Sequence, residues 1–111
     1  MSTAEALAGP APVFAALGDP TRLSLLLRLS REGPQSIAAL AAEVRVTRQG
    51  VTKHLKVLER AGLVRSDRAG RESRFAVQAE PLGVARDYLD ALSRQWDDAL
   101  VRLKAHVEDP H

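Results

Sequence analysis

The sequence contains no cysteine among its 111 residues. Disulfides, thiolate metal ligands, a cysteine nucleophile and a thiol redox switch are therefore excluded. Long apolar runs are missing too, because Arg, Glu or Gly interrupts each stretch well short of the roughly 20 residues that cross a bilayer. The N-terminal segment has neither the basic start nor the apolar centre of a secretory signal. These absences predict a cytoplasmic protein with no membrane partner.

What is present is typical of a folded domain. Hydrophobic residues make up 45% of the chain and charged residues 27%, a balance found in ordered soluble proteins. A chain of this length has room for one domain with a modest core, so association with another chain is expected to add stability. We predict a single domain over residues 10–108 and a flexible segment over residues 1–9.

Charge is unevenly distributed along the chain, although the formal net charge is only +2. Nine of the 16 Lys and Arg residues, but only three of the 14 Asp and Glu residues, lie between Arg45 and Arg74. The middle of the chain therefore forms a basic surface, as in proteins that bind nucleic acid.

Two helices are predicted in the first third of the chain. Prolines near residue 10 open a short helix, and Gly18 ends it. Asp19 and Pro20 start a second helix, because Asp caps free amides and Pro at the first helical position has no amide to leave unpaired. This second helix runs to about Arg31, and its leucines cover so much of its circumference that it should lie centrally.

The remaining signals predict a helix-turn-helix followed by a wing. A short helix at 37–44, capped by Ser36, turns into a helix at 47–60. Two short strands within 63–77 flank a polar tip at 67–72, and a long helix covers 81–108. The predicted fold is mainly α-helical with a small β-hairpin, a winged helix-turn-helix of about five helices and a two-stranded wing.

The helix at 47–60 has one apolar and one polar face. Val51, Leu55 and Leu58 fall within an arc of about 60°, which must face the core. The opposite face suits insertion into the major groove of duplex DNA, and the basic hairpin suits a second contact with phosphates or the minor groove. The predicted DNA-binding residues are Thr47, Arg48, Gln49, Thr52, Lys53, His54, Lys56, Arg60, Arg65, Arg68, Arg71 and Arg74.

Side-chain chemistry divides these residues by role. Arg48, Gln49 and Thr52 offer directional hydrogen bonds to bases, whereas Lys53, Lys56 and Arg60 are suited to anchoring phosphates. His54 lies at the edge of the apolar face, where three roles stay open: a hydrogen bond within the domain, orientation of the helix, or contact with a phosphate.

The last predicted helix carries an apolar stripe longer than a small domain needs for its own core. Left exposed, this stripe would be an adhesive patch, so we predict that it pairs with a second copy and with the first helix. Tyr88 and Trp96 are predicted in the seam or core, with a ligand pocket as the alternative. The predicted dimer-interface residues are Val13, Phe14, Leu17, Ala85, Leu89, Leu92, Trp96, Ala99, Leu103 and Val107.

Three segments carry a resemblance to a known family. They read FAALGDPTRLSLLLRL, SIAALAAEVRVTRQGVTKHLKVLERAGLV and RSDRAGRESRFAV. Over residues 13–77 the chain resembles the ArsR-type, or arsenic-repressor-like, winged helix-turn-helix regulators. The resemblance implies about five helices with a β-wing, a homodimer built from the first and last helices, and operator binding that an effector usually relieves.

The chain departs from the metal-sensing members of that family. Their cysteine motif would fall on the helix at 37–44, where this chain has no cysteine. In the last helix His106 has only Asp109 nearby and no second histidine about three turns upstream, which is too few ligands for zinc. We therefore predict a non-metal-sensing member with no metal site and no cofactor. Whether a small-molecule effector exists, and which one, stays open at this point.

The sequence predicts a sequence-specific DNA-binding transcriptional regulator that acts as a repressor, in the form of a homodimer on an inverted-repeat operator. The alternative is a winged-helix module that binds a protein partner through the same basic face. An enzyme is disfavoured, because the polar residues lie on a convex face and form no catalytic set.

Overall fold

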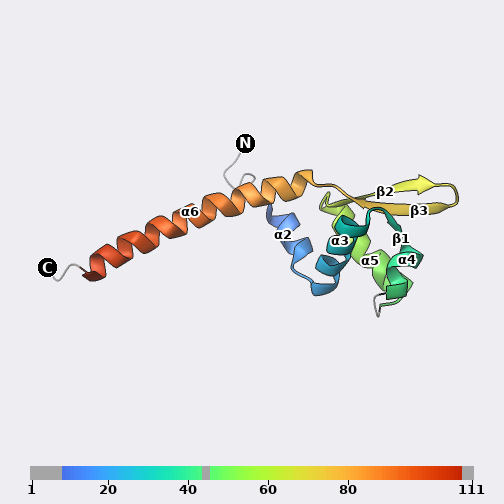
Figure 1. Ribbon diagram of the computed structural model, residues 1–111, viewed down its shortest axis with the longest axis horizontal. Coiled ribbons are helices and arrows are strands. Elements are labelled where there is room, and N and C mark those ends of the chain that lie inside the picture. The colour runs from blue at the N-terminus through green and yellow to red at the C-terminus, as the bar shows by residue number, and fades with distance from the viewer. Residues whose placement is uncertain (1–8, 44–45, 109–111) are drawn as a thin grey trace.

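The computed structural model describes residues 9–43 and 46–108. Four helices and a small sheet form a compact body, from which one long helix and a hairpin project in opposite directions (Figure 1). None of the helices in these two ranges combines the length and hydropathy needed to span a membrane. The elements are α2 (Ala11–Leu17), α3 (Pro20–Glu32), β1 (Gln35–Ser36), α4 (Ile37–Glu43), α5 (Arg48–Arg60), β2 (Val64–Ala69), β3 (Glu72–Val77) and α6 (Glu80–Glu108).

The five predicted helices are confirmed, and α3, α4 and α5 begin at the predicted capping residues. The Asp19 carboxylate accepts a hydrogen bond of 3.0 Å from the backbone N–H of Arg22 at the start of α3. Ser36 Oγ accepts one of 3.1 Å from the N–H of Ala39 in α4. Side-chain acceptors at these positions satisfy amides that have no partner inside the helix. The predicted flexible segment, apart from Gly9, the last residue of the predicted helix at 37–44, and Arg45 of the predicted turn that follows it lie outside the described residues.

The sheet has three strands and not the two predicted. Its order is β1-β3-β2, and β1 pairs antiparallel with β3, with Gln35 opposite Phe75 and Ser36 opposite Arg74. A strand of two residues is too short to produce an alternating pattern. β1 is therefore defined only by its pairing with β3 in the folded chain.

The wing strands also extend further than predicted. The tip is a two-residue turn of Gly70 and Arg71 between Ala69 and Glu72, which is shorter than the predicted tip at 67–72. Gly70 has a φ of 65°, the left-handed conformation that tight hairpin turns need and glycine adopts without strain. Both faces of the outer hairpin are exposed, so no apolar alternation marked its strands.

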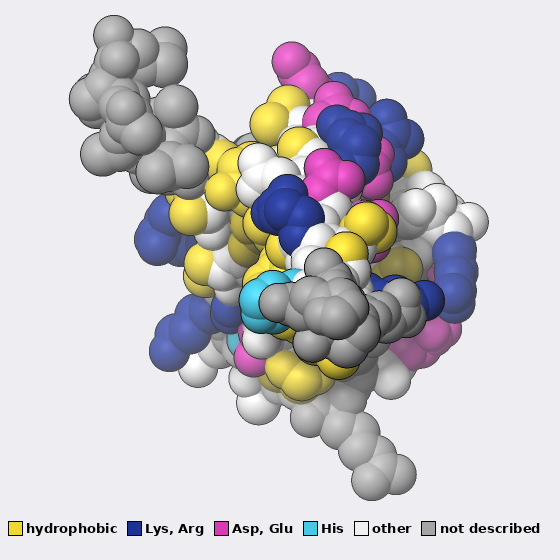
Figure 2. Space-filling view, turned by 90° about the vertical axis from the view of Figure 1, so that its left-hand side faces the viewer, with side chains coloured by type: hydrophobic (Ala, Val, Ile, Leu, Met, Phe, Trp, Pro, Cys, Tyr) yellow, Lys and Arg dark blue, Asp and Glu magenta, His cyan; other side chains and the backbone are white. Residues whose placement is uncertain are grey.

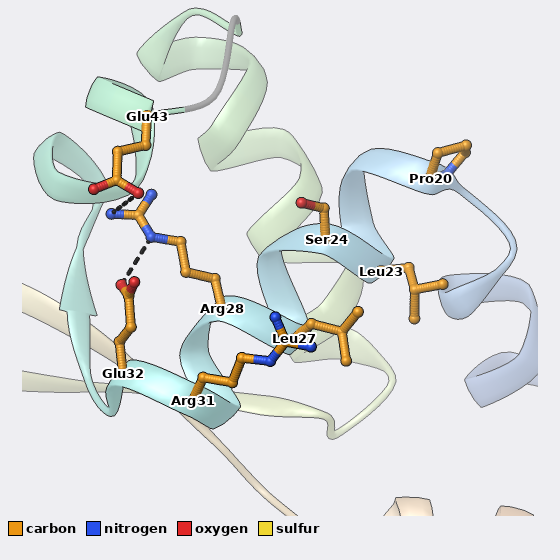
Figure 3. A pocket seen from close by; sticks show the side chains of 8 residues that line it. All are labelled: Pro20, Leu23, Ser24, Leu27, Arg28, Arg31, Glu32 and Glu43. Carbon is orange, nitrogen blue, oxygen red and sulfur yellow. Dashed lines mark hydrogen bonds and ion pairs between the residues drawn. The ribbon is translucent and has the colours of Figure 1, made fainter.

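α3 lies centrally, in contact with α2, α5 and β3, but it is not buried all round. Leu25, Leu26 and Leu29 are buried, whereas Leu23 and Leu27 are 42% and 47% exposed. The two exposed leucines line an open hollow of about 470 Å³ (Figure 3). α3 therefore lies centrally, as predicted, although the side that carries Leu23 and Leu27 stays exposed.

Beside this hollow, Arg28 joins α3 to α4. Its guanidinium lies between two carboxylates, 3.0 Å from Glu32 and 3.4 Å from Glu43 (Figure 3). It also donates to the carbonyls of Ala39 and Leu40 at 3.0 and 3.1 Å. These bonds fix α4, and with it the first half of the helix-turn-helix.

α6 projects far beyond the body of the protein (Figure 1). The radius of gyration is 19.1 Å, against about 13 Å for a compact domain of this length. Near its start α6 packs on α2, where the rings of Phe14 and Tyr88 lie 6.1 Å apart. Further along, its apolar side chains are exposed, from Leu92 at 39% to Val107 at 73%.

Two residues predicted at a dimer interface lie instead in the core of the protomer. Val13 is 6% exposed and Ala85 is 4% exposed. Each occupies the side of its helix that faces the body, because α2 packs between α6 and the other helices. They support the outer surface of α2 and α6 from behind and offer little area to a partner.

Candidate nucleic-acid interface

α5 has one fully buried face. Val51, Leu55 and Leu58 have no exposed surface, which confirms the predicted inward side. Since a helix turns once every 3.6 residues, burying these three side chains fixes which residues of α5 project outward.

The first turn of α5 is held by a cap and by a close contact. Thr47 Oγ1 accepts a hydrogen bond of 3.0 Å from the N–H of Gly50, as its position before the helix predicted. A Cβ on Gly50 would collide with Cγ1 of Val46, so the turn packs this tightly only against glycine. Sequence reasoning missed Gly50, because the need for glycine depends on the path of the turn in space.

The outward face of α5 brings together most of the predicted helix contacts. Gln49, Lys53 and Lys56 are exposed, and Thr52 lies between them with its hydroxyl donating to the carbonyl of Arg48 at 2.8 Å. Thr52 therefore keeps acceptor lone pairs and a methyl group free for a ligand. The five side chains line a hollow of about 400 Å³.

Arg60 is not part of this group. It lies twelve residues along α5 from Arg48, or about 18 Å at 1.5 Å per residue. There it lines a different hollow, beside Pro12 and Ala15 of α2. A ligand that meets the first turns of α5 reaches Arg60 only if it follows the whole helix.

His54 lies inside the domain, between α5 and the start of α3. Its Nδ1 is 3.5 Å from a guanidinium nitrogen of Arg22 and 3.8 Å from the carboxylate of Asp19. Arg22 also donates to the carbonyls of Ala15 and Ala16 at 3.2 and 2.7 Å. This cluster ties α2, α3 and α5 together. Of the three roles left open for His54, the structure shows the hydrogen bond within the domain, and this contact also orients α5.

The surroundings of Asp19 in this cluster lower the pKa of its carboxyl group. The hydrogen bond from the backbone N–H of Arg22 holds its pKa below the usual value of 3.8, and the charges of Arg22 and His54 act in the same direction. A carboxylate whose pKa is lower in the folded state stabilises the fold above the unfolded pKa. That stability is lost as the pH falls below about 3.8 towards the folded value.

We therefore expect Asp19→Asn to flatten the acid limb of the stability curve. Asn retains the cap but does not titrate, so the variant should lose less stability than the wild type between pH 5 and pH 3. Urea unfolding at a fixed protein concentration across this range measures the effect. Asp90→Asn, an exposed carboxylate on α6, is the control, and equal acid limbs for wild type and Asp19→Asn would contradict the assignment.

The wing carries its four arginines on exposed positions. Arg65 and Arg74 each have a carboxylate nearby, Asp67 at 3.0 Å and Glu72 at 3.9 Å respectively. The hairpin projects past the helices on the side opposite to α6 (Figure 1), so α5 and the wing form two separate basic surfaces.

Comparison with known proteins agrees with this geometry. Residues 17–67 match the family described as a helix-turn-helix domain. The HTH-type transcriptional regulator Rv2034 of Mycobacterium tuberculosis is 40% identical over 91 residues, which cover 82% of this chain and 81% of that protein. The solved structure of an ArsR-like transcriptional regulator from Rhodococcus sp. RHA1 superposes with a TM-score of 0.80 at 36% identity, over 96% of this chain and 98% of the other.

The chain belongs to the ArsR-like family of helix-turn-helix transcriptional regulators. This membership confirms the prediction of a DNA-binding regulator over that of a protein-interaction module. A third relative, the HTH-type transcriptional repressor SmtB of Mycobacterium tuberculosis, is 32% identical over 96 residues, or 86% of this chain and 69% of SmtB.

In this ArsR-like regulator the matched residues 17–67 run from the end of α2 into β2. They include α4 and α5, which are the two helices of the helix-turn-helix. Within the described part of the chain, no group of three or more His, Cys, Asp or Glu side chains is arranged to hold a metal ion.

Proposed function

We propose that this regulator is a homodimeric repressor that binds an inverted-repeat operator in duplex DNA. One observation carries the proposal: α5 is fixed by a completely buried apolar face and turns a polar, basic face outward at its N-terminal end. A helix of this kind fits the major groove, where its first turns reach the edges of bases. The name of the relative SmtB supports repression as the outcome.

The outward residues of α5 have separate roles in this proposal. Gln49 and Thr52 read base edges, with Thr52 accepting a hydrogen bond or placing its methyl group against that of thymine. Arg48 has both the charge and the donors for guanine or a phosphate. Lys53 and Lys56 are flexible point charges, which suit phosphates.

The second copy of the chain binds through α6. The large apolar side chains of α6 beyond Tyr88 are exposed in the protomer, and helices in proteins gain most of their stability from packing of an apolar face. Figure 2, which faces the free end of α6, shows hydrophobic side chains gathered beside it on the surface. A two-fold axis through this face would place the two α5 helices in successive major grooves, roughly 34 to 36 Å apart.

The same elements would couple the binding of an effector at α6 to the DNA-binding surface. α2 contacts both α5 and α6, so a ligand that altered the pairing of α6 would change the spacing of the two recognition helices. Operator binding would weaken as a result, because half-site spacing is a fixed geometric requirement.

Selection from random duplexes tests the function. We expect enriched sequences with two inverted half-sites centred about 10 base pairs, or a multiple of a helical turn, apart. Affinity for the selected duplex should fall linearly on a plot of log K against log salt, because Lys and Arg release counterions from phosphates. Failure to enrich any sequence, or duplex affinity that does not change with salt, would contradict the proposal.

A further inference from the structure

The strand register divides the wing arginines between two faces. Directly opposed residues of β2 and β3 share a face. Asp67 is opposite Arg74 and Arg65 is opposite Ala76, so Arg65, Asp67 and Arg74 lie on one face, which we call the outer face. Phe75, the next residue along β3, lies on the opposite face.

The other face, the inner face, continues from the buried part of the sheet. Val64 and Phe75 are 1% and 9% exposed and belong to the hydrophobic core. Arg68 lies opposite Ser73 on this same face, one step further out along the hairpin. The inner face is thus the side of the wing that is turned towards the helices, α5 among them.

Ion pairs follow the same division. On the outer face Arg65 is paired with Asp67 at 3.0 Å, and Arg74 lies 3.9 Å from Glu72. Arg68 on the inner face and Arg71 at the tip are within 4.0 Å of no carboxylate that the structure describes. Exposed ion pairs are weak. The net charge of each face therefore affects DNA binding more than the strength of any one ion pair does.

That balance makes the two faces unequal towards DNA. The outer face has two arginines and two carboxylates, and a carboxylate repels a phosphate wherever the neighbouring guanidinium points. The inner face and the tip carry positive charge without this compensation. The inner face is also the one that continues from the part of the sheet packed against α5.

We infer that the wing of this regulator contacts the DNA backbone through Arg68 and Arg71, and that Asp67 and Glu72 are specificity-determining residues that keep Arg65 and Arg74 from acting as further phosphate anchors. The inference rests on the proposed function. The four wing arginines are then not equivalent, since two bind phosphates and two are neutralised by carboxylates. Because phosphate contacts are indifferent to sequence, limiting them in this way raises the share of binding that comes from α5.

Four single variants test the division: Arg65→Ala, Arg68→Ala, Arg71→Ala and Arg74→Ala. Each removes one positive charge from the same exposed hairpin, so an effect of net charge alone would be equal in all four. Fluorescence anisotropy on the selected duplex at 50 to 200 mM salt gives the affinity and its salt slope. In a dimer, Arg68→Ala and Arg71→Ala should each lower the slope by about 1.8, two contacts at about 0.9 each, and so shrink the affinity ratio between these salts about tenfold.

Arg65→Ala and Arg74→Ala should keep the salt slope of the wild type, because neither removes a phosphate contact, and any loss of affinity from the changed net charge is common to all four variants. Equal losses of slope in all four variants would overturn the inference while leaving the proposed function intact. A wild type that binds no duplex would instead overturn the proposed function.

The double variant Asp67→Asn with Glu72→Gln tests the acidic residues from the other direction. It should bind a non-selected duplex more tightly than the wild type, with a steeper salt slope and a smaller ratio of selected to non-selected affinity. Asp87→Asn is the matched control, because Asp87 lies 3.9 Å from Arg86 in a similar exposed pair on α6. Unchanged affinity of the double variant for the non-selected duplex would overturn the role of Asp67 and Glu72.

Discussion

A double variant in α6, Leu92→Glu with Leu103→Glu, is expected to be monomeric and to bind the operator about 100- to 10,000-fold more weakly than the wild type, the range by which linked sites exceed a single one. In the protomer both leucines are exposed, at 39% and 58%. Neither substitution disturbs the core of the protomer. In a dimer both carboxylates would be buried without partners, which is strongly unfavourable.

Analytical ultracentrifugation at micromolar concentration measures the oligomeric state, and anisotropy on the full operator and on a half-site measures the binding. Val101→Glu is the matched control. Val101 is 66% exposed on the same helix but lies about 160° around the axis from Leu103, at 100° per residue. A wild type that sediments as a folded monomer while bound to one half-site would contradict the dimer, and so would equal effects of Val101→Glu and the double variant.

The second large effect is expected on the outward face of α5. Gln49→Ala or Thr52→Ala should cost about 1 to 3 kcal/mol on the selected operator, as loss of a well-formed base contact does. Binding to non-selected duplexes should barely change. The preference for the base pair that each residue reads should relax at that position alone.

Lys53→Ala is the contrasting variant on the same face, because a flexible ammonium that anchors a phosphate carries no sequence information. It should weaken selected and non-selected duplexes by a similar factor and reduce the salt slope by about 1 per contact. Affinities for a set of operators with single base-pair changes distinguish the two behaviours. If neither class of variant alters operator binding, the assignment of α5 as the recognition helix is wrong.

The local elements were predictable because their signals are local. Asp19, Ser36 and Thr47 cap their helices as expected, since a side-chain acceptor needs only an amide two or three residues away. The inward face of α5 followed from spacing alone, since residues three and four apart share one side of a helix. The residues that line the outward hollow of α5 followed for the same reason.

Sequence reasoning fell short where a residue's environment depends on distant parts of the chain. Leu23 and Leu27 have the same chemistry as Leu26 and Leu29, but only the packing of the other elements decides which side of α3 is covered. Val13 and Ala85 fit an apolar stripe and turned out to face the protomer's own core. Periodicity identifies an apolar face without saying what covers it.

By itself the sequence determined the order of the helices, the position of the helix-turn-helix, the basic middle of the chain and the family to which it belongs. Each of these depends on residue type, spacing and capping, which act over one or two turns. Tertiary structure alone decided that His54 joins Asp19 and Arg22, that β1 completes the sheet, and that two wing arginines lie beside carboxylates while two do not. These features depend on which strand faces which and in what register, and cross-strand distances exist only after the chain has folded.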